Sequence, residues 1–531
     1  MNISTSPPLF QFAIRCLYTI GILGLISLIA TLLFSRHILH EPLSFFIERT
    51  ANHLKTSGGS SKQRYLGNQL LKHLPINDWQ TPQLNQLSPL TSLSGWQGQG
   101  AHPNNQFAPQ QFKSTTPQYA QAGIYYSQRP IHYVNTSQEL LNALHDVQAG
   151  ETIQLQPGNY SLTQNIALTR TGIPDAPITI RAELLGQVKI TIESREGFRV
   201  LSPYWVFENL DIQGQCSLKN HTKCEHAFHV VGEAHSFVLR NNRISDFNAP
   251  LKVNGDSQGN YPDHGLIEKN SFFNTQARQT ANPVTLLNIN SVNHWVVRGN
   301  LIADFAKSQG DYISYGSFMK GNGQNGLYEN NLIICEHILP ADKGVRLGLS
   351  LGGGGTSQNF CRGRSCDTEH SNGIIRNNII LNCSHDVAIY LNRAKSTQIY
   401  NNLIFNSLGI DVRFNPSSAK IFNNIISGRI KTRDGGNYTE TNNLLDLDCI
   451  SPSRQFSNCS FLEWYWDPVN VDFSLNNGEK IIGQGIISEF ETDFCDHQKH
   501  SKVTDIGPIQ YSNQKTCLPN DMNTKKYNPT R

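Results

Sequence analysis

The 531-residue chain has few charged side chains. Asp, Glu, Lys and Arg make up 16% of it, against about a quarter in ordinary soluble domains. The 44 basic side chains nearly balance the 41 acidic ones, which leaves a formal net charge of +3. No segment concentrates Lys and Arg as nucleic-acid-binding surfaces do. Nucleic acid is therefore not expected as a partner.

The sequence also lacks any C-x-x-C spacing, which disfavours a structural zinc site. It has eleven cysteines, of which Cys16 lies in an apolar run. Most of the others lie in pairs close in sequence, and such pairs predict disulfides in a compartment outside the cytosol. These pairs are Cys216 with Cys224, Cys361 with Cys366, Cys449 with Cys459, and Cys495 with Cys517.

One long apolar run lies near the N-terminus. Residues 16–35 are uncharged and flanked by Arg15 and Arg36, and the run has about the length of a transmembrane helix. No A-x-A cleavage site follows, which favours an uncleaved anchor over a signal peptide. Together with the predicted disulfides, this indicates a single-pass protein of a bacterial inner membrane. Residues 1–15 would form a cytoplasmic tail, and the C-terminal body would lie in the periplasm.

The most informative pattern is a repeat built on asparagine. An Asn followed two positions later by an aliphatic or aromatic residue recurs with successive spacings of 28, 30, 31, 47, 24, 22 and 19. Such spacings are typical of an all-β parallel β-helix, whose coils stack their inward side chains. Asn tolerates the left-handed backbone of tight turns and can hydrogen-bond its neighbour in the next coil. The marked residues are Asn242, Asn270, Asn300, Asn331, Asn378, Asn402, Asn424 and Asn443, and Asn209 is expected to begin the series.

A leucine-rich repeat is the closest alternative fold, but its L-x-x-L-x-L spacing is absent. The β-helix register also predicts a fifth disulfide. Cys335 lies four residues after Asn331, and Cys383 lies five after Asn378, so neighbouring coils would bring the two cysteines together.

The repeat divides the chain into segments. Residues 36–123, rich in Gln, Pro, Ser, Thr and Gly, predict a stalk with short helices. Residues 124–449 would form the β-helix, with a helix at 136–147 covering its open N-terminal end. Thr136 and Glu139 would make the capping box of that helix. Residues 450–531 are expected to cap the other end.

Three segments of the early coils resemble a known group of proteins. AGETIQLQPGNYSL (149–162), APITIRAELLGQVKIT (176–191) and YWVFENLDIQG (204–214) are similar to the opening coils of chondroitinase B and alginate lyases, polysaccharide lyase family 6. The likeness extends to about residue 445. It implies a right-handed parallel β-helix that cleaves uronate-containing polysaccharide by β-elimination. That reaction needs a base for the C5 proton, a cation beside the carboxylate and an acid for the leaving oxygen.

The resemblance implies that Lys320 is the base and Arg346 the acid. Lys320 precedes Asn325 and Asn330, whose spacing matches the family pattern. The sequence departs from that pattern at Gly321, where the family has Ser, and after Arg346, where it has His and Gly. These departures leave two alternatives open. One is a C5-epimerase, which begins with the same proton abstraction, and the other is a non-catalytic polysaccharide-binding or export scaffold.

Further polar residues of the coils predict substrate contacts and a metal site. Stacked coils would place basic side chains in one groove for an acidic glycan. The groove residues would be Lys252, Lys320, Arg346 and Arg413, with Asn254, Asn325, Glu336 and His337 as further contacts. The family resemblance also makes calcium a candidate cofactor, with Asp311, Asn322 and Glu336 as its candidate ligands.

Overall fold

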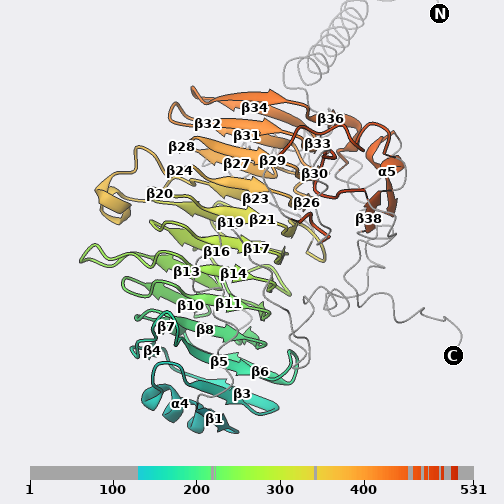
Figure 1. Cartoon of the computed structure of the whole chain (residues 1–531). Helices are drawn as coiled ribbons and strands as arrows, with labels where there is room; N and C mark the ends of the chain where they lie inside the picture. The colour runs from blue at the N-terminus through green and yellow to red at the C-terminus, as the bar shows by residue number, and fades with distance from the viewer. Residues whose placement is uncertain are drawn as a thin grey trace, which may run out of the picture. The chain divides into compact units, whose positions relative to one another are not determined.

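The computed structural model describes residues 130–511, apart from 217–220, 222, 340–343, 452–457, 468–471, 476–477, 489–491 and 496–503. The described chain winds through stacked coils, and its strands form three long parallel sheets (Figure 1). The predicted all-β solenoid is confirmed. Parallel crossover connections are right-handed in nearly all proteins, in agreement with a right-handed β-helix.

The three sheets are named A, B and C after the order of their strands within a coil. Sheet A contains β1 (Ile131–Val134), β2 (Thr152–Leu155), β5 (Ile178–Ala182), β8 (Trp205–Glu208), β11 (Val238–Arg240), β14 (Leu266–Glu268), β17 (Val296–Arg298), β21 (Leu327–Glu329), β25 (Ile374–Arg376), β29 (Thr397–Tyr400), β32 (Ser418–Phe422) and β35 (Asn437–Thr441). Sheet B contains β3 (Gly158–Leu162), β6 (Val188–Ile192), β9 (Asp211–Gly214), β12 (Arg243–Ser245), β15 (Ser271–Phe273), β18 (Leu301–Ala303), β22 (Leu332–Ile334), β26 (Ile379–Leu381), β30 (Leu403–Phe405), β33 (Ile425–Ser427) and β36 (Leu444–Asp446). Sheet C contains β4 (Ile166–Leu168), β7 (Glu196–Val200), β10 (His226–Val231), β13 (Leu251–Asn254), β16 (Val284–Asn290), β19 (Ile313–Lys320), β23 (Val345–Leu351), β27 (Ile389–Asn392), β31 (Gly409–Arg413) and β34 (Arg429–Arg433).

A few shorter elements accompany the sheets. β20 (Gly323–Gln324), β24 (His370–Ser371) and β28 (Ala394–Lys395) form a small parallel sheet, and β37 (Tyr465–Asp467) pairs with β38 (Asp472–Leu475) in antiparallel fashion. The described part of the chain also contains α5 (Phe461–Trp464) and the 3-10 turns η7 (Gln358–Phe360), η8 (Arg362–Arg364) and η9 (Leu447–Cys449).

The predicted helix at the start of the solenoid is present as α4 (Ser137–Asp146). It packs against β1, β2 and β3 and buries Leu140 and Leu144. The Thr136 hydroxyl accepts the backbone N–H of Glu139 at 3.1 Å. The Glu139 carboxylate accepts the N–H of Asn135 at 2.7 Å, one residue before the position that a capping box uses.

The asparagine repeat forms a buried ladder at the turns from sheet A to sheet B. The side-chain oxygen of each ladder residue accepts the backbone N–H of the ladder residue one coil earlier, at 2.9–3.0 Å. The left-handed conformation belongs to the preceding residue, for example Asn241 (φ 52°) and Lys269 (φ 57°), so the prediction that the ladder residues adopt it was wrong. Asn209 is likewise a left-handed turn residue (φ 61°). Leu210 holds the ladder position of that coil, with its N–H on Asn242 Oδ1.

The described part of the C-terminal segment lies along the side of the solenoid. Its described residues Phe461, Trp464 and Tyr465 pack against outward side chains of β18, β22, β26 and β30 in sheet B. α5 and β38 accordingly lie beside β26 and β30 (Figure 1). The physical reason is that these strands are apolar on both faces, so their outer faces need cover. The prediction that residues 450–531 cap the end of the solenoid stays a prediction, because much of that segment lies outside the described residues.

Four predicted disulfides are present, Cys216–Cys224, Cys335–Cys383, Cys361–Cys366 and Cys449–Cys459. Cys495 is disulfide-bonded, while Cys517 and Cys16 lie outside the described residues. The predicted tail, anchor and stalk, residues 1–123, also lie outside them. No helix of the described part has the length and hydropathy of a membrane span.

Candidate functional site

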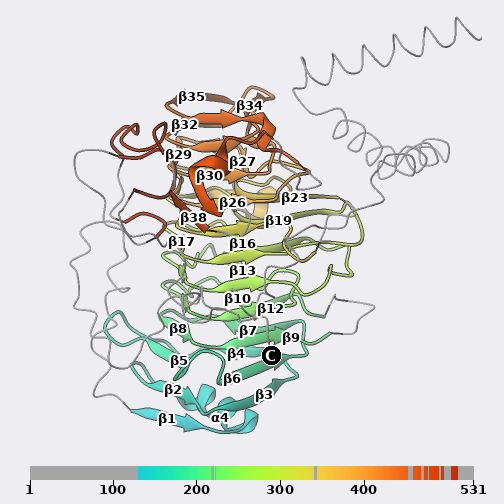
Figure 2. The ribbon, with the colours of Figure 1, turned by 90° about the vertical axis from the view of Figure 1, so that its right-hand side faces the viewer.

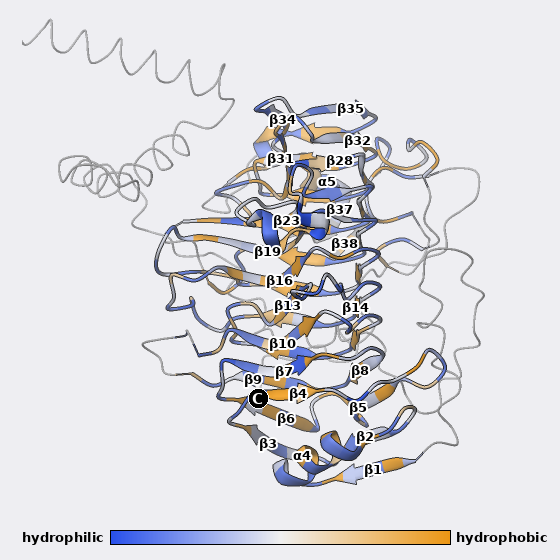
Figure 3. Cartoon of the chain, turned by 90° about the vertical axis from the view of Figure 1, so that its left-hand side faces the viewer, coloured by the Kyte–Doolittle hydropathy of each residue, from blue (hydrophilic) through white to orange (hydrophobic). Residues whose placement is uncertain are grey.

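The candidate site lies on the outer face of sheet C. Side chains alternate between core and surface along a strand, so on β13 Leu251 and Val253 are buried while Lys252 and Asn254 face outward. Hydrophobic and hydrophilic residues follow one another along the sheet C strands (Figure 3). The strands of this sheet stack in order from β4 to β27 (Figure 2), so outward side chains of successive coils become neighbours.

The register of the strands brings several polar residues into two adjoining rows. Lys252 is paired with His229 of β10 and with Asn288 of β16. Two positions further along the strands, Asn290 is paired with Lys320. Of the predicted groove residues, the structure therefore places Lys252 and Lys320 on one face. We refer to the surface formed by Lys252, Asn254, Asn288, Asn290 and Lys320 as the sheet C groove.

Lys252 is the residue of this groove best suited to acid–base chemistry. Its Nζ donates to Asn288 Oδ1 at 3.0 Å. Burial by its neighbours, together with the positive charge of Lys320, lowers the pKa of Lys252 to about 7. A base whose pKa lies near neutrality is partly deprotonated and able to accept a proton under ordinary conditions.

Lys320 lies at the end of β19, where a loop of four consecutive glycines, residues 352–355, packs against it. Its Nζ donates to the backbone oxygen of Gly354 at 3.0 Å and lies 4.4 Å from the centre of the Phe318 ring. Burial lowers the pKa of Lys320, and the carboxylate of Glu369 opposes that shift. Gly352 (φ 74°) permits the close approach of this loop, because a Cβ there would lie 1.8 Å from the Asn392 oxygen.

The amides of the groove are held by defined partners. His229 lies between Glu196 and Asn254, with Nδ1 3.0 Å from Glu196 Oε1 and Nε2 2.9 Å from Asn254 Oδ1. The hydrogen bond from His229 lowers the pKa of Glu196 despite partial burial. Asn290 donates through Nδ2 to Asn288 Oδ1 at 2.5 Å. These contacts fix the outward polar groups beside Lys252.

The structure does not place Arg346 beside Lys320. It pairs in register with Ser314, six residues before Lys320 on β19. Arg346 is only 4% exposed, and its Nη1 lies 3.0 Å from Glu336 Oε1. The predicted base–acid pair is therefore corrected, because the start of β23 places Arg346 at the opposite end of the strand.

Glu336 and His337 belong to the same buried turn between sheets B and C. Glu336 Oε1 lies 3.2 Å from His385 Nδ1 as well as close to Arg346. The His337 N–H donates to Asp304 Oδ1 at 2.9 Å, and burial raises the pKa of Asp304 to about 6. Glu336 and His337 are thus not placed in the sheet C groove as substrate contacts.

The two remaining predicted contacts are not among the groove residues. Arg413 faces outward on β31, where it pairs with Asp434 and lies 3.4 Å from the Tyr390 hydroxyl. Asn325 lies in a turn beyond the end of β19, with Nδ2 3.4 Å from His294 Nε2.

The candidate calcium ligands do not share a site. Asp311 forms an ion pair with Lys307. The side-chain amide of Asn322 donates to the backbone oxygen of Arg362 at 2.9 Å, and Glu336 forms an ion pair with Arg346. Within the described part, the group of close metal-type ligands is Asp446, Cys449 and Cys459, and its two cysteines form a disulfide. Neither this group nor the three predicted ligands fit a calcium ion.

Sequence reasoning missed the contribution of Asn288 and Asn290. The signal was present in the segment VTLLNIN, where polar residues take alternate positions in an otherwise apolar strand. In a parallel β-helix that alternation marks outward side chains. His229 and Glu196 carry a weaker signal, since only the register shows that they meet.

Comparison with known proteins gives one family match and a group of similar structures. The chondroitinase B family model matches residues 134–257. Pectate lyase Pel9A shares 14% identity over 74% of this chain and 98% of its own, with a TM-score of 0.45. A PL6-family polysaccharide lyase from Pseudopedobacter saltans shares 16% identity over 59% of this chain and 92% of its own, with a TM-score of 0.34. An alginate lyase from Paenibacillus sp. str. FPU-7 shares 12% identity over 60% and 95%, with a TM-score of 0.33.

No curated protein sequence matches the chain. The family match covers the first coils, and Lys252 and Asn254 fall within it, whereas Lys320 lies beyond. The predicted resemblance is confirmed: in residues 134–257 the chain is similar to chondroitinase B.

Proposed function

We propose that this chain acts on an acidic, uronate-containing polysaccharide by β-elimination in the sheet C groove. The observation that carries the proposal is Lys252, an outward lysine whose pKa is lowered to about 7 and which lies in a row of amides beside a second lysine. The similarity to chondroitinase B over the coils that contain Lys252 supports it.

The groove offers groups for two needs of the reaction. The Lys320 ammonium is the cation that would neutralise the uronate carboxylate and so acidify the C5 proton. Neutral Lys252 would accept that proton while the C5–H electrons form the C4–C5 double bond and the C4–O bond breaks. The leaving oxygen would take its proton from water, because Arg346 lies elsewhere.

Location is a second part of this proposal. We propose a single-pass protein of a bacterial inner membrane, anchored by residues 16–35, with the β-helix in the periplasm. Four disulfides among the described residues support an oxidising compartment. A reporter fused to the C-terminus would be active in the periplasm, and activity of a cytoplasmic reporter at that position would contradict the topology.

The test is the ultraviolet absorbance of the unsaturated uronate during incubation of the full chain with alginate, chondroitin or polygalacturonate. Lys252→Arg keeps a positive charge but removes the base, so we expect the rate on the preferred polymer to fall by about 10²–10⁴-fold. Lys420→Arg, the same change at an exposed position on sheet A, is the matched control and should leave the rate unchanged.

Two other outcomes would point elsewhere. Equal rates in Lys252→Arg and the wild-type chain would contradict the role of Lys252. Binding of a polymer without any absorbance change would favour the scaffold, or a C5-epimerase if the recovered polymer has inverted C5 centres.

A further inference from the structure

A separate pocket opens on the outer face of sheet B, at the corner between β9 and β10. Its volume is about 360 Å³, and its lining includes Lys189 of β6, Gln213 of β9, Asp246, Thr275, His221 and Arg278. The Cys216–Cys224 disulfide closes the loop that carries His221. None of these residues belongs to the sheet C groove.

His221, a residue of the pocket lining, has a buried ring N–H without a partner in the described structure. The residue is fully buried, and its Nδ1 accepts the backbone N–H of Gln279 at 2.9 Å. Burial, aided by the charge of Arg278, lowers the pKa of His221 to about 4, so the ring is neutral at pH 7. Because Nδ1 is an acceptor, the proton of the neutral ring lies on Nε2. That atom has no hydrogen-bond partner among the described residues.

Arg278 supplies a buried positive charge with an open donor. It is 1% exposed, and its Nε donates to Asn248 Oδ1 at 3.0 Å. Burial lowers the pKa of Arg278 to about 10, which leaves it cationic at neutral pH. Nη2 has no hydrogen-bond partner in the described part of the chain. The carboxylates of Asp246 and Glu225 partly oppose the effect of burial on this pKa, but Nη2 has no hydrogen bond to the described residues, and a bound anion would supply one.

The nearby carboxylate of Asp246 is already engaged. Its Oδ1 accepts the N–H of Thr275 at 2.8 Å and the hydroxyl of Thr275 at 2.9 Å. Its Oδ2 accepts the side-chain amide of Gln213 at 2.9 Å. The pocket lining therefore includes two N–H donors without partners in the part of the chain that the structure describes, and the exposed ammonium of Lys189. Its carboxylate, Asp246, already accepts hydrogen bonds from Thr275 and Gln213.

We infer that this pocket binds a uronic acid unit, with the sugar carboxylate on Arg278 and His221. A guanidinium and a neighbouring N–H are suited to a planar carboxylate. Thr191, Gln213, Gln215 and Gln276 in the lining can hydrogen-bond the ring hydroxyls, and a volume of about 360 Å³ accommodates a small ligand. The choice of a uronate rests on the proposed function, whereas the anion-binding chemistry does not.

The test is isothermal titration of the full chain with glucuronate and galacturonate, with glucose and sulfate as comparison ligands. The titrations use the Lys320→Met variant, because the weakened groove then contributes less to the measured heat. Arg278→Gln in this background should weaken uronate binding by about tenfold or more. Lys189→Met changes an exposed side chain, so it leaves the fold intact and should weaken binding several-fold, and more at low salt.

Each result decides between defined possibilities. Unchanged uronate affinity in both Arg278→Gln and Lys189→Met would overturn the inference. Sulfate binding as tight as that of glucuronate would overturn the uronate assignment. If Arg278-dependent uronate binding occurs while no polymer is cleaved, the pocket stands and the proposed lyase function fails. If polymer is cleaved without Arg278-dependent binding, the proposed function stands and the pocket fails.

Discussion

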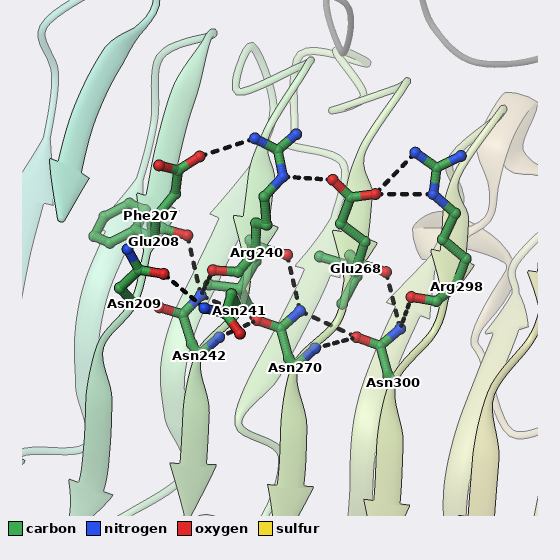
Figure 4. A network of polar contacts seen from close by, with 12 residues as sticks. Phe207, Glu208, Asn209, Arg240, Asn241, Asn242, Glu268, Asn270, Arg298 and Asn300 are labelled. Carbon is green, nitrogen blue, oxygen red and sulfur yellow. Dashed lines mark hydrogen bonds and ion pairs between the residues drawn. The ribbon is translucent and has the colours of Figure 1, made fainter. Parts of the chain in front are cut away.

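At the residue scale, one buried amide per coil connects each turn to the next. Asn300 illustrates the arrangement (Figure 4). Its Nδ2 donates to the Ile267 oxygen at 2.9 Å and to Asn331 Oδ1 at 3.0 Å, and its Oδ1 accepts the N–H of Asn270 at 2.9 Å. Burial of these amide groups without hydrogen-bond partners would be costly. The ladder therefore supplies partners for the backbone groups of the turns, and it also fixes the register between coils.

Replacement of a ladder residue should therefore destabilise the β-helix strongly. In Asn300→Ala the N–H of Asn270 and the oxygen of Ile267 lose their buried partner. We expect a loss of about 2–4 kcal/mol in unfolding free energy, measured by urea denaturation followed by circular dichroism. Asn159→Ala, at an exposed position on β3, is the control and should stay within about 0.5 kcal/mol of wild type. Equal effects of the two substitutions would contradict the role of the ladder.

The charge of Lys320 gives the groove a testable pH dependence. Lys252 must be neutral to accept a proton, so the elimination rate should rise with pH through about 7, the folded pKa of Lys252. Lys320→Met removes a charge that lowers this pKa, so the rising limb should move to higher pH. The measurement is the pH profile of kcat/KM for both proteins, and an unchanged limb in the variant would contradict the coupling.

At the element scale, the strands of sheet A carry alternating charges along one row. The register aligns Glu208, Arg240, Glu268 and Arg298 across successive coils, and Figure 4 shows their carboxylates and guanidinium groups in line. Arg240 lies 2.9 Å from Glu208 and also pairs with Glu268, which lies 2.8 Å from Arg298. This charge ladder opposes any slip of one coil against the next.

Glu268 should be the most sensitive member of the charge ladder. Burial by itself would raise its pKa, but Arg240 and Arg298 outweigh that effect and lower it. Glu268→Gln leaves these two guanidinium groups without their shared carboxylate, so we expect a loss of about 3 kcal/mol at pH 7 in chemical denaturation. Glu440→Gln, exposed on β35, should have little effect, and a loss as large as that of Glu268→Gln would contradict this assignment.

The same pair of variants gives a pH prediction with a defined sign. Because the folded pKa of Glu268 is lowered, its contribution is present above the unfolded pKa. It disappears as the pH falls through the folded pKa. The stability difference between wild type and Glu268→Gln should therefore shrink in acid below pH about 4.

Sequence periodicity predicted the elements well because the stacking constraint repeats in every coil. The asparagine spacing marked the turns, and it also brought Cys335 and Cys383 together. Arg346 could not be placed in this way, because the asparagine spacing marks the turns from sheet A to sheet B and does not show where each strand of sheet C begins. Lys252 was identified as a groove residue, but its pKa depends on burial and on the charge of Lys320 from another coil, which the sequence does not show.

At the scale of the whole molecule, sheet B changes character along the solenoid. In the early coils its outer face carries Lys189, Gln213 and other polar residues, which line the proposed uronate pocket. In later coils the outward residues are apolar, such as Leu332 and Leu403, and the C-terminal segment covers them. The sequence indicates this cover, because the short strands after the later ladder residues are apolar at successive positions. Such strands place apolar side chains on both faces of sheet B, and both faces must then be buried.

Trp464 of α5 tests this cover. It is 9% exposed and packs with Phe461, with ring centres 5.0 Å apart. Trp464→Ala should cost about 3–5 kcal/mol of local stability and release the C-terminal segment to proteolysis, while the coils stay resistant. Limited proteolysis with mass spectrometry would detect the cleavages, with Phe360→Ala, 74% exposed, as control. Cleavage rates equal to wild type would contradict the proposed packing role.

The central claim is that Lys252 removes the C5 proton of a bound uronate. Proton NMR of a uronate oligosaccharide incubated with the full chain in deuterated water tests it most directly, because elimination and epimerisation both break the C5–H bond. We predict that the C5 proton signal disappears with the wild-type chain and persists with Lys252→Arg. A C5 signal that persists with a wild-type chain that binds the oligosaccharide would contradict the claim and favour a binding scaffold.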